Sequence, residues 1–375
     1  MKIPLILLLA LLMYSEIVIA APFAYVANTD SDNVSIINVS TKEKIGTVDV
    51  GKRPEVIAAS VDGKFVYVAN SGANTVSVIE VSSKKVVDTI EVKDTPLEIA
   101  ASPDGDFVYV SNNLSNDLSI IDTSSNDVVG TVSLGERPEG IAFTPDSKFA
   151  YVAVTDNNVV AVIEVSSMEV VKTITNVGNK PTCITIDPEG NFAYISDINS
   201  GAITIIDIST NQVSGNISLA SVEDCCEGLC LQVTPDGTTL YVVYSTSVVA
   251  IDLSTNQIVK TINTNGNGWA ECLAITPDGE FVYVSNVDPT AITPNPPISI
   301  IEVSSNTVVD ENIVAGDGPY GIAMTPEADS ETPDSGGNGS GGGSCSLAQA
   351  GQTNISFLLF ILTMGFFIVA RITRR

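Results

Sequence analysis

The 375-residue sequence contains no histidine. This absence excludes serine or cysteine nucleophiles activated by histidine, zinc or copper sites with histidine ligands, and an axial histidine for haem. Positive charge is also scarce, since 17 Lys and Arg stand against 44 Asp and Glu and the net charge is −27. Proteins that bind nucleic acids need clustered Lys and Arg for the phosphates, so this charge argues against a nucleic-acid partner. It argues equally against docking on an anionic membrane surface.

Aromatic residues are few as well, at 6% of the chain with a single tryptophan. The periodic regions are instead rich in Val, Ile, Thr and Ser, which favours strands over helices. No segment has apolar residues at positions i, i+3, i+4 and i+7, so a helical solenoid is excluded. We therefore expect an all-β fold.

A motif that reads "YVAN" or a close variant occurs seven times. Its tyrosines lie 42 to 47 residues apart, at Tyr25, Tyr67, Tyr109, Tyr151, Tyr194, Tyr241 and Tyr283. One complete unit, residues 54–92, has four short apolar runs at 56–60, 65–70, 75–81 and 85–92, separated by turn-forming residues. Four antiparallel strands in about 40 residues are typical of a propeller blade. The seven copies therefore predict a seven-bladed β-propeller.

The first copy, "FAYVAN" at 23–28, has no inner strand before it. Inner strands are predicted at seven places: Val56–Ser60, Ile99–Ser102, Gly140–Thr144, Cys183–Asp187, Leu229–Thr234, Cys272–Thr276 and Gly321–Thr325. The last of these, within "GPYGIAMTPE" at 318–327, has no second strand after it. We therefore expect one composite blade, with three strands from the start of the chain and one from the end. Such closure pairs strand edges that would otherwise be exposed.

The repeated segments "GIAFTPDSKFAYVAV", "NTVSVIEVSSKKVVDTI" and "VGTVSLGERPEGIA" resemble the YVTN family of β-propeller repeat proteins. The resemblance covers about residues 22–327 and recurs in every predicted blade. It implies the propeller fold and, because this family occurs in archaeal surface-layer proteins and secreted bacterial proteins, a location at the cell surface. It implies no single activity, because propellers host many.

The two ends of the chain carry targeting patterns around a propeller domain predicted at 21–327. Residues 1–20 combine a basic start, an apolar stretch and small residues before position 21, which predicts a signal peptide and export. Residues 328–344 are acidic and then rich in Gly and Ser, which predicts a flexible linker. Within 345–375, an apolar run at 355–370 is followed by three arginines, which predicts a transmembrane anchor with a cytoplasmic end.

Cys345 directly follows the glycines of the linker. This layout resembles bacterial C-terminal sorting signals, in which a short motif precedes an apolar helix and a basic end. The resemblance implies processing near Cys345, with the thiol carrying a surface linkage. The alternative is a simple anchor in which Cys345 is incidental or palmitoylated.

The crossovers that lead into the inner strands should gather at one mouth of the central channel. They bring charged and aromatic residues to a predicted ligand-binding rim: Arg53, Glu55, Arg137, Glu139, Lys180, Trp269, Glu271 and Tyr320. One interpretation is a mixed-charge ligand or cation site with an aromatic stacking surface. The other is that Glu55 pairs with Arg53 and Glu139 with Arg137 as solvated ion pairs of little energetic value.

Cysteines concentrate in one sector of the same mouth. Cys183, Cys230 and Cys272 occupy one position of three consecutive inner strands, and an enlarged repeat adds Cys225 and Cys226. In an exported chain these five thiols predict disulfides that join the insertion to the neighbouring inner strands. Two alternatives stay open, a vicinal Cys225–Cys226 disulfide and a soft-metal thiolate site with Glu223, Asp224 or Glu227 as further ligands.

Two predicted turns between second and third strands have compositions that suggest binding features. "NTDSDN" at 28–33 resembles part of a calcium loop but lacks its glycine and terminal glutamate, so a polar turn with Asn and Asp accepting backbone N–H groups is favoured. The proline-rich 288–297 predicts an exposed, stiff loop.

No catalytic residue and no cofactor site can be named from these patterns. The favoured function is a binding or structural module of the cell envelope, outside the cell, with an envelope protein or a surface glycan as partner. A propeller enzyme of lactonase type would need convergent carboxylates and arginines at one channel mouth, where Arg53, Glu55, Arg137, Glu139 and Glu271 are the candidates. Metal handling by the cysteines is the third hypothesis.

Overall fold

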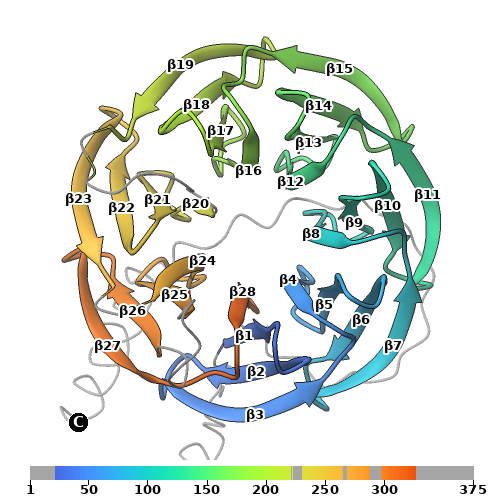
Figure 1. Cartoon of the computed structure of the whole chain (residues 1–375), viewed down its shortest axis with the longest axis vertical. Helices are drawn as coiled ribbons and strands as arrows, with labels where there is room; N and C mark the ends of the chain where they lie inside the picture. Colours follow the sequence, from blue (N-terminus) through green and yellow to red (C-terminus); the bar gives the residue numbers. More distant parts are fainter. Residues whose placement is uncertain (1–21, 221, 223–229, 265–267, 288–296, 327–375) are drawn as a thin grey trace, which may run out of the picture. The chain divides into compact units, whose positions relative to one another are not determined.

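Strands make up all the regular structure that the computed structural model describes, in residues 22–220, 222, 230–264, 268–287 and 297–326. Twenty-eight strands form seven four-stranded antiparallel sheets, the blades, which surround a central channel (Figure 1). The prediction of a seven-bladed propeller is confirmed. The predicted signal peptide at 1–20, the linker at 328–344, Cys345 and the apolar run at 355–370 lie outside the described residues. Within the described residues, no helix is long and apolar enough to cross a membrane.

Each blade has four strands that run in order from the channel outwards. The innermost strands are β4 (Pro54–Ala59), β8 (Pro96–Ala101), β12 (Pro138–Phe143), β16 (Pro181–Ile186), β20 (Leu231–Val233), β24 (Trp269–Ile275) and β28 (Pro319–Met324). The second strands are β1 (Phe23–Asn28), β5 (Phe65–Asn70), β9 (Phe107–Asn112), β13 (Phe149–Val154), β17 (Phe192–Asp197), β21 (Thr239–Tyr244) and β25 (Phe281–Val287).

The third strands are β2 (Asn33–Asn38), β6 (Thr75–Glu80), β10 (Asp117–Asp122), β14 (Val159–Glu164), β18 (Ala202–Asp207), β22 (Ser247–Asp252) and β26 (Ile298–Glu302). The outermost strands are β3 (Glu43–Asp49), β7 (Lys85–Glu91), β11 (Asp127–Ser133), β15 (Glu169–Thr175), β19 (Gln212–Ser218), β23 (Gln257–Asn263) and β27 (Thr307–Ile313).

Most inner strands begin earlier than predicted, at the proline that precedes the apolar run. In β4 the pairing starts with Pro54 opposite Asn70 and shifts register before Ile57, so a bulge joins the proline to the regular ladder. A proline can open a strand because its missing N–H is not needed at the first position. The β20 strand is the exception, since only three of the residues predicted at Leu229–Thr234 pair with β21.

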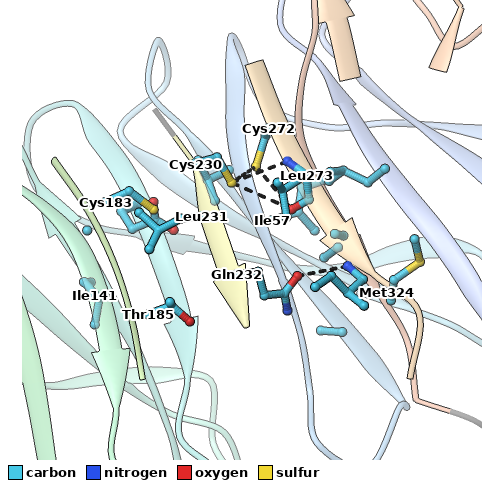
Figure 2. Close-up of a pocket in the computed structure, with 18 of the residues that line it drawn as sticks. Ile57, Ile141, Cys183, Thr185, Cys230, Leu231, Gln232, Cys272, Leu273 and Met324 are labelled. Carbon is cyan, nitrogen blue, oxygen red and sulfur yellow. Dashed lines mark hydrogen bonds between the residues drawn. The ribbon is translucent and has the colours of Figure 1, made fainter. Parts of the chain in front are cut away.

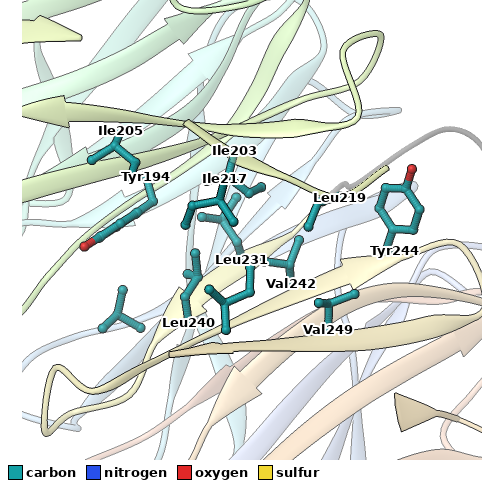
Figure 3. Close-up of a cluster of buried hydrophobic side chains, with 12 residues drawn as sticks. Tyr194, Ile203, Ile205, Ile217, Leu219, Leu231, Leu240, Val242, Tyr244 and Val249 are labelled. Atoms are coloured by element: carbon teal, nitrogen blue, oxygen red, sulfur yellow. The ribbon is translucent and has the colours of Figure 1, made fainter. Parts of the chain in front are cut away.

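The core consists of side chains clamped between neighbouring blades. Second and third strands are buried on both faces, as the five consecutive buried residues of β5 illustrate. We count the blades along the chain, with the sheet that contains β1 as the first. Between the fifth blade (β16 to β19) and the sixth (β20 to β23), Tyr194 and Ile205 pack against Leu240 and Val249 (Figure 3). Burying both faces removes the polar alternation of an exposed strand, which explains the continuous apolar runs in the sequence.

All seven repeat tyrosines are buried in this layer. Two of their hydroxyls donate to an asparagine of the following blade: Tyr241 donates to Asn306 Oδ1 at 2.6 Å, and Tyr151 donates to Asn211 Oδ1. Burial raises the pKa of Tyr241 to about 12, so the hydroxyl remains a donor at neutral pH. The tyrosine that marks the repeat therefore links consecutive blades.

The ring closes in the composite blade, whose strand order is β28-β1-β2-β3. Tyr25 of β1 pairs with Ala323 of β28, and the backbone N–H of Phe23 donates to Thr325 Oγ1 at 2.9 Å. We call this junction between β1 and β28 the seam. Beside it, the backbone N–H of Gly316 donates to Asn28 Oδ1 at 2.8 Å. The prediction of closure between the two ends of the repeat region is confirmed.

Deleting residues 318–327 should therefore unfold the whole ring although it removes a single strand. The loss of β28 exposes the edge of β1 and opens the packing between the first and seventh blades. We expect aggregation in size-exclusion chromatography and no cooperative melting by circular dichroism. Deletion of residues 331–340, outside the described residues, is the length-matched control and should leave melting unchanged. A soluble, cooperatively melting 318–327 deletion would contradict this account of the seam.

A polar contact within the blades uses one repeat position near the end of the second strand. Asn28, Asn70, Asn112 and Asn286 each donate from Nδ2 to a serine of the third strand at 2.9 Å. In the fifth blade the position holds Asp197, which is 5% exposed and accepts from Thr204 at 2.9 Å. Burial raises the pKa of Asp197 to about 7, against the opposing effect of its hydrogen bonds.

The raised pKa of Asp197 makes stability depend on pH in a definite direction. The unfolded carboxyl titrates near 3.9, so the stability linked to its protonation is complete below about pH 4 and is lost as the pH rises through about 7. Asp197→Asn should remove this loss, so the variant should be more stable than the wild type by about 2 kcal/mol or more at pH 8 and by little at pH 4. Urea unfolding at both pH values measures the difference.

Asn70→Asp is the matched control, because Asn70 also bonds two hydroxyl groups, those of Thr75 and Ser77. This substitution should introduce the same dependence into a blade that lacks it. A difference between Asp197→Asn and wild type that stays constant from pH 4 to pH 8 would contradict the assignment.

Candidate functional site

The central channel forms a cavity of about 620 Å³ that is lined by all seven inner strands. Its wall combines carboxylates, thiols and one phenol with aliphatic side chains, part of which Figure 2 shows. Inner strands can supply such a site because their side chains alternate between the channel and the blade. The volume lies within the range of small-molecule sites.

Glu55, Glu139 and Glu271 occupy one repeat position, twelve residues before the tyrosine of their blade, and line the channel from inner strands β4, β12 and β24. Glu55 is 7% exposed, accepts from Ser71 Oγ at 2.9 Å and lies 3.3 Å from the guanidinium of Arg53. Glu139 lies 3.0 Å from the guanidinium of Arg137. Burial raises the pKa of Glu139, and the Arg137 charge opposes that rise. The predicted ion pairs therefore exist, with carboxylates that are more buried than solvated pairs would be.

Glu98 is a fourth channel carboxylate, and the sequence patterns did not identify it. It occupies the third position of β8, one residue later than the other three, and its backbone N–H donates to Ser111 Oγ at 3.1 Å. Burial, followed by the charge of Cys183, raises the pKa of Glu98 well above its usual value. The signal in the sequence is "PLEI" in place of "PEVI", a one-residue shift that places a carboxylate where other blades have valine, glycine or cysteine.

Tyr320 of β28 brings a phenol to the same end of the channel. Burial raises its pKa well above the usual value, and the charges of Glu271, Glu55 and Cys272 raise it further. The hydroxyl therefore stays protonated and can donate a hydrogen bond. Tyr320 lines the same cavity as Glu55 and Glu271, which come from separate blades.

The remaining predicted rim residues lie outside the channel lining. Trp269, at the start of β24, is 51% exposed. Lys180 and Arg137 both approach Asp156 at 3.8 Å. The structure thus divides the predicted rim into channel residues, Glu55, Glu139, Glu271 and Tyr320, and outer residues, Arg53, Arg137, Lys180 and Trp269.

Arg53, Arg137 and Lys180 have a repeated backbone role at this rim. Each has a positive φ, and its N–H donates to an Asp or Asn side chain in the hairpin turn of the preceding blade. Asp32 of "NTDSDN" accepts in this way from Arg53 at 2.9 Å. The interpretation of this segment as a polar turn is confirmed. Within the ranges that the structure describes, no group of three or more acidic or cysteine residues is arranged to hold a metal ion.

Cys183, Cys230 and Cys272 lie on adjacent blades as predicted, and this structure has all three as free thiols. Cys225, Cys226, Glu223, Asp224 and Glu227 lie outside the described residues, as does most of 288–297. The disulfides predicted between the insertion and the inner strands therefore stay predictions.

The third position of the inner strands sets the spacing of the channel wall. A Cβ added to Gly140 would lie 2.5 Å from the carbonyl oxygen of Thr182 in the next inner strand, and one added to Gly321 would lie 2.4 Å from that of Glu55. Side chains at this position therefore point towards the neighbouring inner strand. Gly140 and Gly321 leave room for that backbone.

Gly140→Ala should destabilise the propeller by about 1–3 kcal/mol, because the methyl group would overlap backbone atoms that cannot rotate away. Gly46→Ala, on an outer strand with nothing within 4 Å of the added Cβ, is the control and should change stability by less than about 0.5 kcal/mol. Chemical unfolding measures both. Equal stability of the two variants would show that neighbouring inner strands do not limit the size of this residue.

Two propeller families match parts of the chain. A YNCE-like β-propeller model matches residues 17–148, and a seven-bladed β-propeller lactonase model matches residues 118–233. Neither match covers half of the chain, so the similarity is to propeller families and to no single activity. A search of curated proteins finds no match. The YVTN resemblance and its surface-layer type remain predictions.

Solved structures with the same fold come from proteins of different function. The chain resembles a functionally unknown protein from Desulfotomaculum acetoxidans, with a TM-score of 0.70, 20% identity, and coverage of 81% of this chain and 99% of that one. Hydrazine synthase of Kuenenia stuttgartiensis matches with a TM-score of 0.59, 23% identity, and coverage of 67% and 77%. Dihydro-heme d1 dehydrogenase NirN matches with a TM-score of 0.59, 16% identity, and coverage of 80% and 74%. At these identities the likeness extends to the fold alone.

Proposed function

We propose that this chain is an exported binding module whose central channel binds an organic ligand with aliphatic amines. The observation that carries the proposal is the set of four glutamates, from β4, β8, β12 and β24, around one cavity of about 620 Å³. A cavity of this size accommodates several ligand groups at once. Carboxylates on separate blades can therefore bind separate amines of one molecule.

The charges of the site favour a cationic ligand over an anionic one. Arg53 and Arg137 lie against Glu55 and Glu139, on the rim side, and do not line the channel. The net charge of −27 adds a field that attracts cations and repels anions. Burial raises the pKa of Glu98 and of Glu139, and an ammonium group bound beside these carboxyls would oppose that rise.

The amine chemistry has two natural sources at a cell envelope, a polyamine and an amino sugar of a surface glycan. The envelope location is part of the proposal and rests on the sequence of residues 1–20 and 355–370. Anchoring by the C-terminal segment, with processing at Cys345 as its variant, belongs to the same proposal. The partner is then the glycan or a free amine outside the cell.

Lactone hydrolysis is the second candidate function. The lactonase model covers residues 118–233, which include Arg137 and the channel residue Glu139, whose side chains lie 3.0 Å apart. A carboxylate and a guanidinium in contact could polarise a lactone carbonyl and position water. The chain offers no histidine for general-base catalysis, so Glu139 would have to act as the base.

Isothermal titration with spermidine and with a glucosamine oligomer tests the binding proposal. We expect saturable binding of at least one probe, with spermidine affinity increasing with pH as Glu98 and Glu139 ionise. Glu98→Gln should weaken binding about tenfold at pH 8, because a charge-assisted hydrogen bond is lost, and should flatten the pH dependence. Preference for spermidine indicates a polyamine, and preference for the oligomer indicates a glycan.

Glu169→Gln is the matched control, because Glu169 is an exposed carboxylate on outer strand β15. Its affinity should equal that of the wild type. Equal weakening by Glu98→Gln and Glu169→Gln would reduce the effect to overall charge and contradict a channel site. Turnover of a lactone panel that is lost in Glu139→Ala would overturn the proposal in favour of the second candidate.

A further inference from the structure

Cys183, Cys230 and Cys272 occupy the repeat position that Gly140 and Gly321 hold as the third residue of β12 and β28, where side chains face the next inner strand. Figure 2 shows the three thiols on neighbouring strands of the channel wall. Cys230 immediately precedes β20, and Cys272 lies within β24. This repeat position therefore directs the Cys230 side chain across the boundary between the sixth and seventh blades.

The Sγ atoms of Cys230 and Cys272 lie 2.8 Å apart. This separation is shorter than the roughly 3.5–4.0 Å at which even carbon atoms, which are smaller than sulfur, pack without a bond. It exceeds a disulfide bond of about 2.05 Å by a shift that a small side-chain rotation supplies. The backbone N–H of Leu273 also donates to Cys230 Sγ at 3.4 Å, so the sulfur is held against β24.

We propose that Cys230 and Cys272 form a disulfide that joins the inner strands of the sixth and seventh blades. The oxidant is an external disulfide, such as an oxidised low-molecular-weight thiol or a thiol oxidoreductase. One cysteine attacks it to form a mixed disulfide, and the other cysteine then displaces the remaining external sulfur. The two cysteines lose two protons and two electrons, and the oxidant leaves as two thiols.

The bond is a structural link rather than a reversible switch. Hydrogen bonding to Cys183, followed by that to Cys272 and by burial, raises the pKa of the Cys230 thiol well above its usual value. A thiol that resists ionisation exchanges slowly in the folded protein. We therefore expect the bond to form during folding and to persist.

The sixth blade is where such a link has the largest effect. Its inner strand β20 has three residues, whereas the other inner strands have six or seven. A shorter strand contributes fewer ladder hydrogen bonds to hold the channel wall. The disulfide would close a loop of 42 residues and attach the start of β20 to β24.

The pairing is tested in the full chain with Cys225, Cys226 and Cys345 replaced by serine, so that only three thiols remain. After treatment with oxidised glutathione, the denatured protein should have one reactive thiol and a mass about 2 Da below that of its reduced form. Peptide mapping should find Cys230 linked to Cys272, in this variant and in the unsubstituted chain. Reduction should lower Tm by roughly 5–10 °C.

Single substitutions separate the possible pairs. Cys183→Ser should keep the linked peptide and the Tm of its parent, whereas Cys272→Ser should lose about the same number of degrees as reduction does. Three reactive thiols after oxidation would overturn the proposal, as would a Cys183–Cys230 link in place of Cys230–Cys272. Mapping of the unsubstituted chain decides the matter even if a variant fails to fold.

Discussion

Face-to-face packing of neighbouring blades is the constraint on which the rest of the molecule depends. Each second and third strand is buried on both faces, so a blade has no core of its own and is complete only between two others. The arrangement requires a closed ring, because an open one would leave two apolar faces exposed. The seam between β1 and β28 meets this requirement by joining the two ends of the repeat region within one sheet.

The same requirement positions the channel chemistry. Inner strands converge so closely that the third position faces the backbone of the next strand, which favours glycine at Gly140 and Gly321 and places Cys230 against β24. The repeat position before it points into the remaining space, where Glu55, Glu139, Glu271 and Tyr320 line one cavity. Carboxylates that are far apart in the sequence therefore share one cavity, and their reduced hydration raises the pKa of Glu98 and Glu139.

Much of the fold was predictable because the same four-strand pattern recurs in seven copies along the sequence. The number of blades, the four strands in each and the composite blade all follow from the spacing of the tyrosines and from the unmatched segments at 23–28 and 318–327. The inner-strand boundaries were less accurate, since a bulge lets Pro54 join its strand. The sequence patterns did not identify Glu98, because it lies one repeat position after Glu55, Glu139 and Glu271. This shift hardly changes the apolar pattern of the strand, but it changes which residues the side chain contacts.

The sequence alone specifies the periodic features of this protein, because strand formation and blade packing depend on local alternation and on turn residues that recur in every copy. Its composition also excludes histidine chemistry and argues against a nucleic-acid partner. Only the tertiary structure decides which side chains meet across the channel. The curvature of the ring brings residues of separate blades into one cavity, directs Arg53 and Arg137 towards the rim, and places Cys230 and Cys272 in contact. These contacts depend on the distances between blades in space, and the spacing of residues along the chain does not determine those distances.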